Sequence, residues 1–446
     1  MVRLVHTRDR PGEFSILVDG ESLTTKAKIL SLYRLEGELK PSLVEGGACL
    51  VTDLDPEAGG FAWEALLHSI YLHTVYSLYP AISSKSPLRG TQAPADLEHT
   101  LNTYRNVACV NRVGELATLR DAAAGRPAVL ALPGPSLDPQ ALAAFSGRAV
   151  IIAVGRALPA LLSAGVVPDI LYMQDTSAYA WSYTCEGITD RLPTVAVANP
   201  VAPIHAHLDA FAFVYKAWNC YPFETVSYPK IEEVAPSSAS GAYSLARFLG
   251  CDRILLAGFD CGRQAPPDSA LPGVAEMADT DEELKMPRYR VDRAGPFRIT
   301  PPGGRTLETK CDYVTSVQWM KSRAMRDQLN ADVEVFESSA TGFARGNSVL
   351  RPAEDFRPAD ESFRPEFPRQ ANAYDTRGFI GFFRERFEML GRVLAQGRLP
   401  DGPLPAPFNC VLGGLDQLPA PGAALTDEQK ASVLERLEQC LAALRD

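Results

Sequence analysis

The stretch from residue 236 to residue 262 (PSSASGAYSLARFLGCDRILLAGFDCG) restricts the fold of this chain more than any other part. It reads as a Ser/Gly-rich loop, a short helix, a short strand and an acidic strand end. Ile254-Leu255-Leu256-Ala257 is apolar throughout, which is typical of a strand buried on both faces of a parallel sheet. Gly250 suits the left-handed position that ends a helix. A loop–helix–strand unit of this kind predicts an α/β fold.

The alternation of strands and helices continues from residue 101 to about residue 349. Short apolar runs predict strands at 128–132, 149–154, 170–173, 194–198, 254–257 and 333–336. Apolar residues at helical spacing predict helices at 139–145, 157–164, 242–249 and 312–328. Interleaved strands and helices predict a Rossmann-like, mostly parallel sheet with helices on both faces.

The composition shifts along the chain predict three parts. Residues 1–105 read as an N-terminal α/β module, with a strand from Phe14, a helix at 61–78 and a polar linker at 84–95. Residues 106–349, which carry the alternating strands and helices, are predicted to form the Rossmann-like domain.

Two further segments stand apart from this rhythm. The Pro-, Gly- and charge-rich insertion at 265–305 is either a lid or substrate loop, or an irregular excursion without a role. Residues 350–446 predict a Pro-rich connector and C-terminal helices, one at 375–396 and a last one that Thr426 and Gln429 begin as a capping box. These helices pack either on the central domain or on a second copy of the chain, which would make a homo-oligomer.

Charge and cysteine usage exclude several classes of protein. The net charge is -10, which argues against a general nucleic-acid binder. The nine cysteines show no C-x-x-C spacing, so the sequence predicts reduced thiols and neither a zinc site nor a disulfide framework. No secretory h-region opens the chain and no run reaches the ~18–20 uninterrupted apolar residues of a membrane span, so we expect a cytoplasmic protein.

The loop LPGPSL at 132–137 is the first candidate binding loop. It follows an apolar strand and precedes a helix, so it is a candidate phosphate or nucleotide cradle. Gly134 permits close approach, Pro135 fixes the turn, and Ser136 offers a hydroxyl and an N–H. The loop matches neither G-x-G-x-x-G nor the P-loop pattern. A simple Pro-Ser turn would also account for it.

The Ser/Gly-rich loop of the opening stretch is the second candidate. Ser238 or Ser240 can cap the helix, whose free N–H groups then favour an anion, and Gly241 lets a backbone or ligand come close. A capped helix that binds no ligand is the alternative.

Polar residues close four of the predicted strands, namely Ser136, Asp175, Asn199 and Asp260. A single residue of this kind is usually a turn former. Because the carboxyl ends of parallel strands converge on one crevice, four of them in one domain predict a ligand site.

The motif pair LPGPSL and SASGAYSLARFLGCDRILLAGFD resembles the motility accessory factors, which are sialyltransferase-like proteins that glycosylate flagellin. The same domain family includes the 6-hydroxymethylpterin diphosphokinase-like enzymes. The segment from Gly165 through Asp169 to Asp175 also fits, and the resemblance covers residues 106–346.

In the related bacterial sialyltransferases these two loops hold the nucleotide of a CMP-linked sugar. The resemblance thus implies a glycosyltransferase that moves a nonulosonic, sialic-acid-like sugar from a CMP donor to a protein hydroxyl, with flagellin as the candidate acceptor. The expected donor-binding residues are Gly134, Pro135, Ser136, Asn199, Ser238, Ser240 and Gly241.

Two departures from the sialyltransferases concern the chemistry. Pro133 stands where they carry an Asn before Gly-Pro-Ser, and no histidine follows His207, although they use a downstream histidine as general base. A carboxylate would have to replace it, and the candidates are Asp175, Asp260 and Glu308.

Two alternatives stay open. One is a diphosphokinase-like enzyme that uses Mg-ATP, with Asp175 and Asp260 binding magnesium together with phosphate oxygens. The other is a non-catalytic nucleotide-binding or scaffold protein. Apart from magnesium in the first alternative, no metal site or dedicated cofactor is expected.

Overall fold

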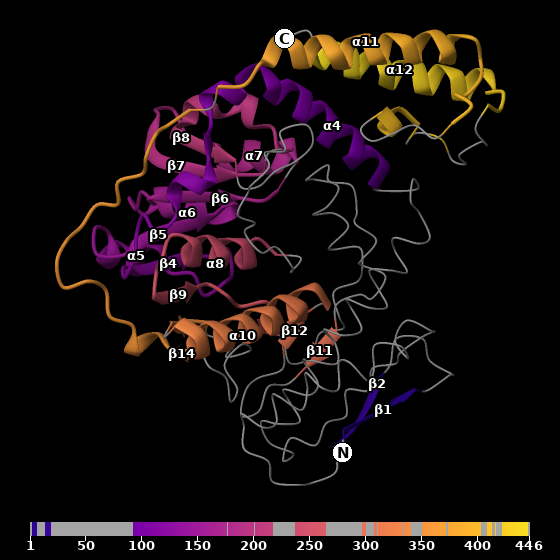
Figure 1. The fold of residues 1–446 in the computed structure, drawn as a ribbon. Coiled ribbons are helices and arrows are strands. Elements are labelled where there is room, and N and C mark those ends of the chain that lie inside the picture. Colours follow the sequence, from indigo (N-terminus) through magenta and orange to yellow (C-terminus); the bar gives the residue numbers. More distant parts are fainter. Residues whose placement is uncertain are drawn as a thin grey trace.

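The computed structural model of the protein (Figure 1) describes most of the central and C-terminal parts of the chain. The described residues are 2–6, 14–18, 92–175, 177–199, 201–216, 237–264, 297–299, 307–309, 311–331, 333–339, 350–371, 373–402, 408–412, 415 and 422–444. The helix predicted at 61–78 and most of the insertion predicted at 265–305 lie outside these residues.

A nine-stranded sheet forms the centre of the protein, with the order β14-β13-β9-β4-β5-β6-β7-β8-β3. Every neighbouring pair in it is parallel. Its strands are β3 (Gly114–Glu115), β4 (Pro127–Ala131), β5 (Val150–Val154), β6 (Ile170–Met173), β7 (Leu192–Ala198), β8 (Phe211–Lys216), β9 (Arg253–Ala257), β13 (Glu334–Glu337) and β14 (Leu350–Pro352). The predicted Rossmann-like fold is confirmed.

Helices cover both faces of this sheet (Figure 1). On one face lie α8 (Ser238–Phe248) and α10 (Cys311–Ala331), and on the other lie α5 (Pro139–Leu142), α6 (Leu158–Ser163) and α7 (Ala178–Thr184). Because side chains alternate along a strand, neighbouring residues of β4 enter different cores. Leu130 packs in the α8/α10 core and Val129 in the opposite one.

The C-terminal helices share a third core with a helix from far earlier in the chain. Along one side of α11 (Thr376–Ala395), Phe383 and Phe387 pack against Tyr104 of α4 (Gln92–Cys109) and against α12 (Asp427–Ala443). The predicted capping box at the start of α12 is confirmed.

Helix α4 was not predicted from the sequence. It begins at Gln92, inside the predicted linker at 84–95, and continues across the predicted domain boundary at 105–106. Pro94 is its third residue, where proline is tolerated because the first turn has no intrahelical partner for its N–H. The polar, proline-bearing sequence from Gln92 onward therefore marks the start of a helix.

A connector at 353–375 runs from β14 to α11 along the outside of the sheet (Figure 1, orange). Its backbone bonds to the segment before β5, where Phe363 N–H donates to Gly147 O and Ala359 N–H donates to Arg148 O. Between it and the amino ends of β6 and β7 lies an open groove of about 920 Å³, whose charged lining residues are Asp169, Arg364, Glu366 and Arg369.

A buried ion pair fixes the far edge of the sheet to the start of α11. Lys216 is 1 % exposed and its Nζ lies 3.0 Å from Glu115 Oε1. The same Oε1 accepts a hydrogen bond from the hydroxyl of Tyr374. Burial raises the pKa of Tyr374, and the hydrogen bond to Glu115 raises it further, so the phenol stays protonated and able to donate.

Two small antiparallel sheets complete the described structure. β1 (Val2–His6) pairs with β2 (Phe14–Val18), which confirms the strand predicted from Phe14. β12 (Leu307–Thr309) pairs with β10 (Arg263–Gln264) and β11 (Phe297–Ile299), so β11 gives the predicted insertion one regular element. Among the described residues, no helix is both long and apolar enough to cross a membrane.

Candidate active site at the carboxyl edge of the sheet

The chain changes direction in the sheet between β4 and β9. From β4 the strands proceed in sequence to β8, and the chain then returns through α8 to place β9 on the other side of β4. The helices that follow β4 and precede β9 cover opposite faces of the sheet. The loops that flank such a switch point separate, and open α/β sheets bind their ligands in the crevice between them.

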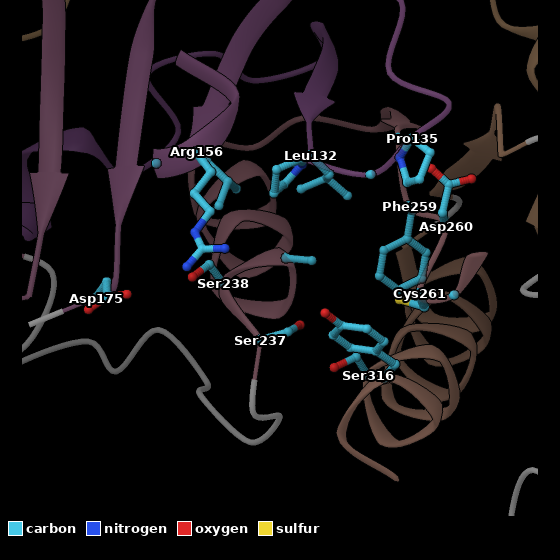
Figure 2. A pocket seen from close by; sticks show the side chains of 18 of the residues that line it. Leu132, Pro135, Arg156, Asp175, Ser237, Ser238, Phe259, Asp260, Cys261 and Ser316 are labelled. Carbon is cyan, nitrogen blue, oxygen red and sulfur yellow. The ribbon is translucent and has the colours of Figure 1, made fainter. Parts of the chain in front are cut away.

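A cavity of about 490 Å³ lies at this point (Figure 2). Its walls come from the carboxyl ends of β4, β5, β6 and β9, from the start of α8 and from α10. The volume is within the range of about 300–1,000 Å³ that is usual for small-molecule sites. The predicted site residues that line it are Gly134, Pro135, Asp175, Ser238 and Asp260, whereas Ser136, Asn199, Ser240 and Gly241 do not.

Asp260 holds the loop after β4 in place. Its Oδ2 accepts hydrogen bonds from Ser136 N–H at 2.7 Å and from Ser136 Oγ at 2.9 Å, and its Oδ1 accepts one from Ser339 Oγ at 2.8 Å. Asp260 is only 2 % exposed. The two donors of Ser136 that the sequence assigned to a phosphate therefore bind a carboxylate of the protein itself.

Gly134 is required by the packing of two loops. Its N–H donates to Gly258 O at 3.1 Å, and a Cβ at position 134 would overlap that carbonyl and the Asp260 carboxylate. Glycine at this position thus lets the loops after β4 and β9 come together. The sequence predicted a close approach at Gly134, and the atoms that come close are those of Gly258 and Asp260.

The start of α8 differs from the prediction. The helix begins at Ser238 and its N-cap residue is Ser237, so Ser238 and Ser240 lie within the helix and are not its cap. Ser240 Oγ donates to Ser237 O at 2.6 Å. Gly241 faces Tyr172 of β6 so closely that a Cβ would overlap the phenol. The helix extends to Ser238 because small residues permit this contact with the sheet.

The first turn of α8 nevertheless presents polar groups to the cavity. Ser237 makes no side-chain capping bond, and its Oγ is buried without a hydrogen-bond partner among the described residues. Ser237, Ser238 and Ala239 all line the cavity. Free N–H groups in the first turn, together with the helix dipole, favour an anion at this place.

Asp175 lies on the opposite wall, directly after β6. Its Oδ1 accepts a hydrogen bond from Ser177 N–H at 2.9 Å, and its backbone carbonyl accepts one from Trp181 Nε1 at 2.8 Å. The carboxylate is partly exposed and lines the cavity (Figure 2). It is therefore held in position and still reachable by a ligand.

Asn199 lies beside the cavity, and the strand that carries Glu308 borders it through Thr309. The amide of Asn199 donates to Gln174 O at 3.3 Å and accepts from Val201 N–H at 3.0 Å, so it braces the turn that carries Asp175. Glu308 belongs to β12, and its side chain is outside the described residues. Its neighbour Thr309 lines the cavity and donates to Cys261 O at 2.7 Å.

Arg156 is the main residue that the sequence analysis missed. It follows β5 in a short 3-10 turn, is exposed, and lines the cavity. Figure 2 shows its guanidinium pointing toward Ser238. In the sequence it looks like an interruption of an apolar run, and only its place directly after a buried strand could have indicated a site. Arg263, Tyr313 and Ser316 also line the cavity and were not predicted.

Cys261 follows Asp260 with a left-handed backbone, at φ 52°, and its side chain lines the cavity. Burial raises the pKa of this thiol well above its ordinary value, and the nearby Asp260 and Glu337 raise it further. The thiol therefore stays protonated near neutral pH, which makes it a poor nucleophile.

The described residues contain no group of three or more His, Cys, Asp or Glu that could hold a metal ion. Magnesium, however, is usually bound through one or two carboxylates together with substrate phosphates. The partly exposed carboxylate of Asp175 lines the cavity and is compatible with a magnesium ion delivered by a nucleotide, whereas the buried Asp260 carboxylate already accepts three hydrogen bonds.

Comparison with known proteins agrees with the motif pair. Residues 101–265 match the family model described as 6-hydroxymethylpterin diphosphokinase MptE-like. Among solved structures, the MAf glycosyltransferase from Magnetospirillum magneticum AMB-1 is similar, with 15% identity, a TM-score of 0.45, and coverage of 95% of this chain and 63% of that chain. This chain thus spans less than two thirds of that protein's length. No curated protein matches the chain. The predicted resemblance to the MptE-like domain family is confirmed for residues 101–265, which carry Gly134, Asp175 and Asp260.

Proposed function

We propose that this protein is a glycosyltransferase that moves a nonulosonic, sialic-acid-like sugar from a CMP-linked donor to a protein hydroxyl. The observation that carries the proposal is the cavity at the switch point. It brings together a helix N-terminus, an accessible arginine and an accessible carboxylate, which are the groups needed to bind and activate a phosphate-linked donor.

The two sides of the cavity suit the two parts of a nucleotide. Leu132, Pro135 and Phe259 give one side an apolar surface that fits a base and ribose. Arg156 and the first turn of α8 give the other side cationic and N–H donors, which favour a phosphate.

Asp175 is the residue that we assign as general base. In the reaction, the acceptor hydroxyl oxygen forms a bond to the anomeric carbon of the sugar while the bond from that carbon to the phosphate oxygen breaks. The electron pair of the broken bond leaves with CMP, and the proton of the hydroxyl passes to the Asp175 carboxylate. General-base assistance of this kind typically contributes about 10²–10⁴-fold in rate.

The acceptor and the location are expectations of the sequence that this proposal keeps. We assign flagellin or a similar protein as the acceptor, and the cytoplasm as the place of the reaction, on the resemblance to motility accessory factors. The outer face of α11, where Phe382 and Met389 are exposed, offers a surface for that acceptor or for a second copy of the chain.

A second candidate has its own support. The matching family model is that of a diphosphokinase-like domain, and Asp175 and Asp260 line one cavity. In this reading the donor is Mg-ATP, and an acceptor hydroxyl attacks its β-phosphorus so that diphosphate is transferred and AMP leaves.

Calorimetric titration separates these candidates. The protein is titrated with CMP, with ATP, and with ATP plus magnesium. Glycosyl transfer predicts heat with CMP and none with ATP in either form. Magnesium-dependent ATP binding without CMP binding would replace the first proposal by the second. CMP binding without sugar transfer to any protein acceptor would favour a non-catalytic nucleotide-binding protein.

A further inference from the structure

We infer that Asp260 is a positioning residue that holds the loop after β4 as a wall of the donor site, and that it does not act as a base. The three residues Asp260, Ser136 and Ser339 are called the Asp260 clasp below. The inference rests on the proposed function in one respect, since its consequence is measured as donor binding.

The clasp joins the carboxyl ends of three strands. Asp260 follows β9, Ser136 follows β4 and Ser339 follows β13. The carboxylate accepts three hydrogen bonds of 2.7–2.9 Å from the two serines. Asp260 is 2 % exposed and Ser339 is fully buried, so water competes little for these bonds.

These bonds occupy most of the carboxylate. An ionised carboxyl group has about four acceptor sites, and three of them here receive protein donors. A general base needs a site directed at the acceptor hydroxyl. Asp175 is partly exposed whereas Asp260 is 2 % exposed, so Asp175 is the more accessible carboxylate.

The clasped loop forms part of the cavity surface. Gly134 and Pro135 line the cavity, and Ser136 is the next residue along the chain. The Gly134 N–H bond to Gly258 O holds the loop from a second point. Loss of the clasp would free the Ser136 end of the loop and displace the wall against which the donor packs.

Substitution of Asp260 by asparagine distinguishes a positioning role from a role as general base. Asp260→Asn keeps the size of the side chain and one oxygen. With that oxygen toward Ser136 and the amide nitrogen toward Ser339, whose hydroxyl can then accept, all three bonds can persist. The amide cannot take up a proton as a base does. Asp260→Ala removes both the bonds and the basic group.

The experiment compares Asp260→Asn, Asp260→Ala and Ser339→Ala with the natural protein by CMP titration and by sugar-transfer kinetics. We expect Asp260→Asn to stay within about threefold in both kcat and KM. We expect Asp260→Ala to lose about 10- to 100-fold in CMP affinity, the effect of losing hydrogen bonds to a charged group, and Ser339→Ala to lose less. A large loss of kcat in Asp260→Asn with unchanged CMP affinity would overturn the inference and return Asp260 to the chemistry.

Hydrogen–deuterium exchange of the ligand-free protein gives a second measurement that does not need the proposed function. We expect peptides covering 132–138 to exchange faster in Asp260→Ala and Ser339→Ala than in the natural protein, and unchanged in Asp260→Asn. Equal exchange of this loop in all four proteins would refute the clasp even if CMP binds. Faster exchange in a protein that binds no nucleotide would support the clasp and reject the proposed function.

Discussion

Each of the two walls of the cavity carries an aspartate, and the two carboxylates differ in burial and in hydrogen bonding. Asp260, after β9, is buried and accepts three hydrogen bonds from serines on neighbouring strand ends. Asp175, after β6, is partly exposed, accepts a side-chain hydrogen bond from Ser177 N–H, and accepts the Trp181 bond at its backbone carbonyl. Asp260 holds the loop after β4 in place, whereas the Asp175 carboxylate is accessible from the cavity. The strand ends bring both aspartates to one cavity, and the hydrogen-bond donors around each carboxylate decide its role.

The largest effect is expected at Asp175, on the wall of the cavity that follows β6; this wall, which also carries Arg156 after β5, is called the open wall below. Asp175→Asn should lower kcat by about 10²–10⁴-fold, since the acceptor hydroxyl loses its general base. Donor affinity should change little, because the amide keeps an acceptor for Ser177 N–H. Transfer kinetics and CMP titration measure both quantities. A kcat close to that of the natural protein would remove Asp175 from the mechanism and erase the contrast between the walls.

A smaller effect is expected at Arg156, which supplies charge to the open wall. Arg156→Ala should weaken CMP binding by about 10- to 100-fold, the range for one charge-assisted hydrogen bond. Arg156→Lys should keep part of the affinity, because it keeps the charge and loses the planar fork. Titration with cytidine alone is the control, and the loss should vanish there. An equal loss with cytidine would place Arg156 away from the phosphate.

A substitution in the loop that the Asp260 clasp holds should lower the free energy of unfolding. Gly134→Ala would force a Cβ against Gly258 O and the Asp260 carboxylate, and overpacking of this kind costs about 1–3 kcal/mol. Gly381→Ala on α11 is the matched control, since no atom lies near its Cβ and alanine favours a helix. Denaturant unfolding should show a loss only for the first variant. Equal stability of the two would show that the loop has room.

The smallest expected effect is a pH dependence of stability on the Asp175 side of the cavity. His207 stacks on Trp181, which bonds to the carbonyl of Asp175. Burial lowers the pKa of His207 and of His205. A lowered pKa in the folded state gives stability that is present above the ordinary value of about 6.5 and is lost as the pH falls below it.

We therefore expect Tm to fall between pH 7.5 and pH 5.5, and the fall to shrink in His207→Gln. Exchange at peptides from β6 and α7 should increase over this range more than exchange at 132–138. A pH-dependent increase in exchange confined to 132–138 would contradict the assignment of this pH dependence to the histidines beside the Asp175 wall.

The sheet was readable from the sequence, because its central strands are uniformly apolar and short. β8 was not predicted, because FAFVYK ends in a lysine whose burial depends on Glu115, a residue far away in the chain. Helix α4 was missed because Pro94 and the polar residues around it are compatible with both a linker and a helix start.

The site was readable in its location and less so in its roles. Strand-end reasoning brought Asp175 and Asp260 to one cavity, and the glycine of the first loop to its wall. It could not show that Ser136 bonds to Asp260, because such pairing depends on the approach of two loops that are distant in sequence. It also passed over Arg156, since a single arginine after a strand carries no motif.

The central claim is that a nucleotide binds between these two walls, and the exchange footprint of CMP tests it most directly. At saturating CMP, the account predicts protection at the ends of β4, β5 and β6 and in the first turn of α8, with no change at the groove that Asp169, Arg364 and Arg369 line on the opposite edge of the sheet. Protection at that groove, or none at the four strand and helix ends, would contradict it.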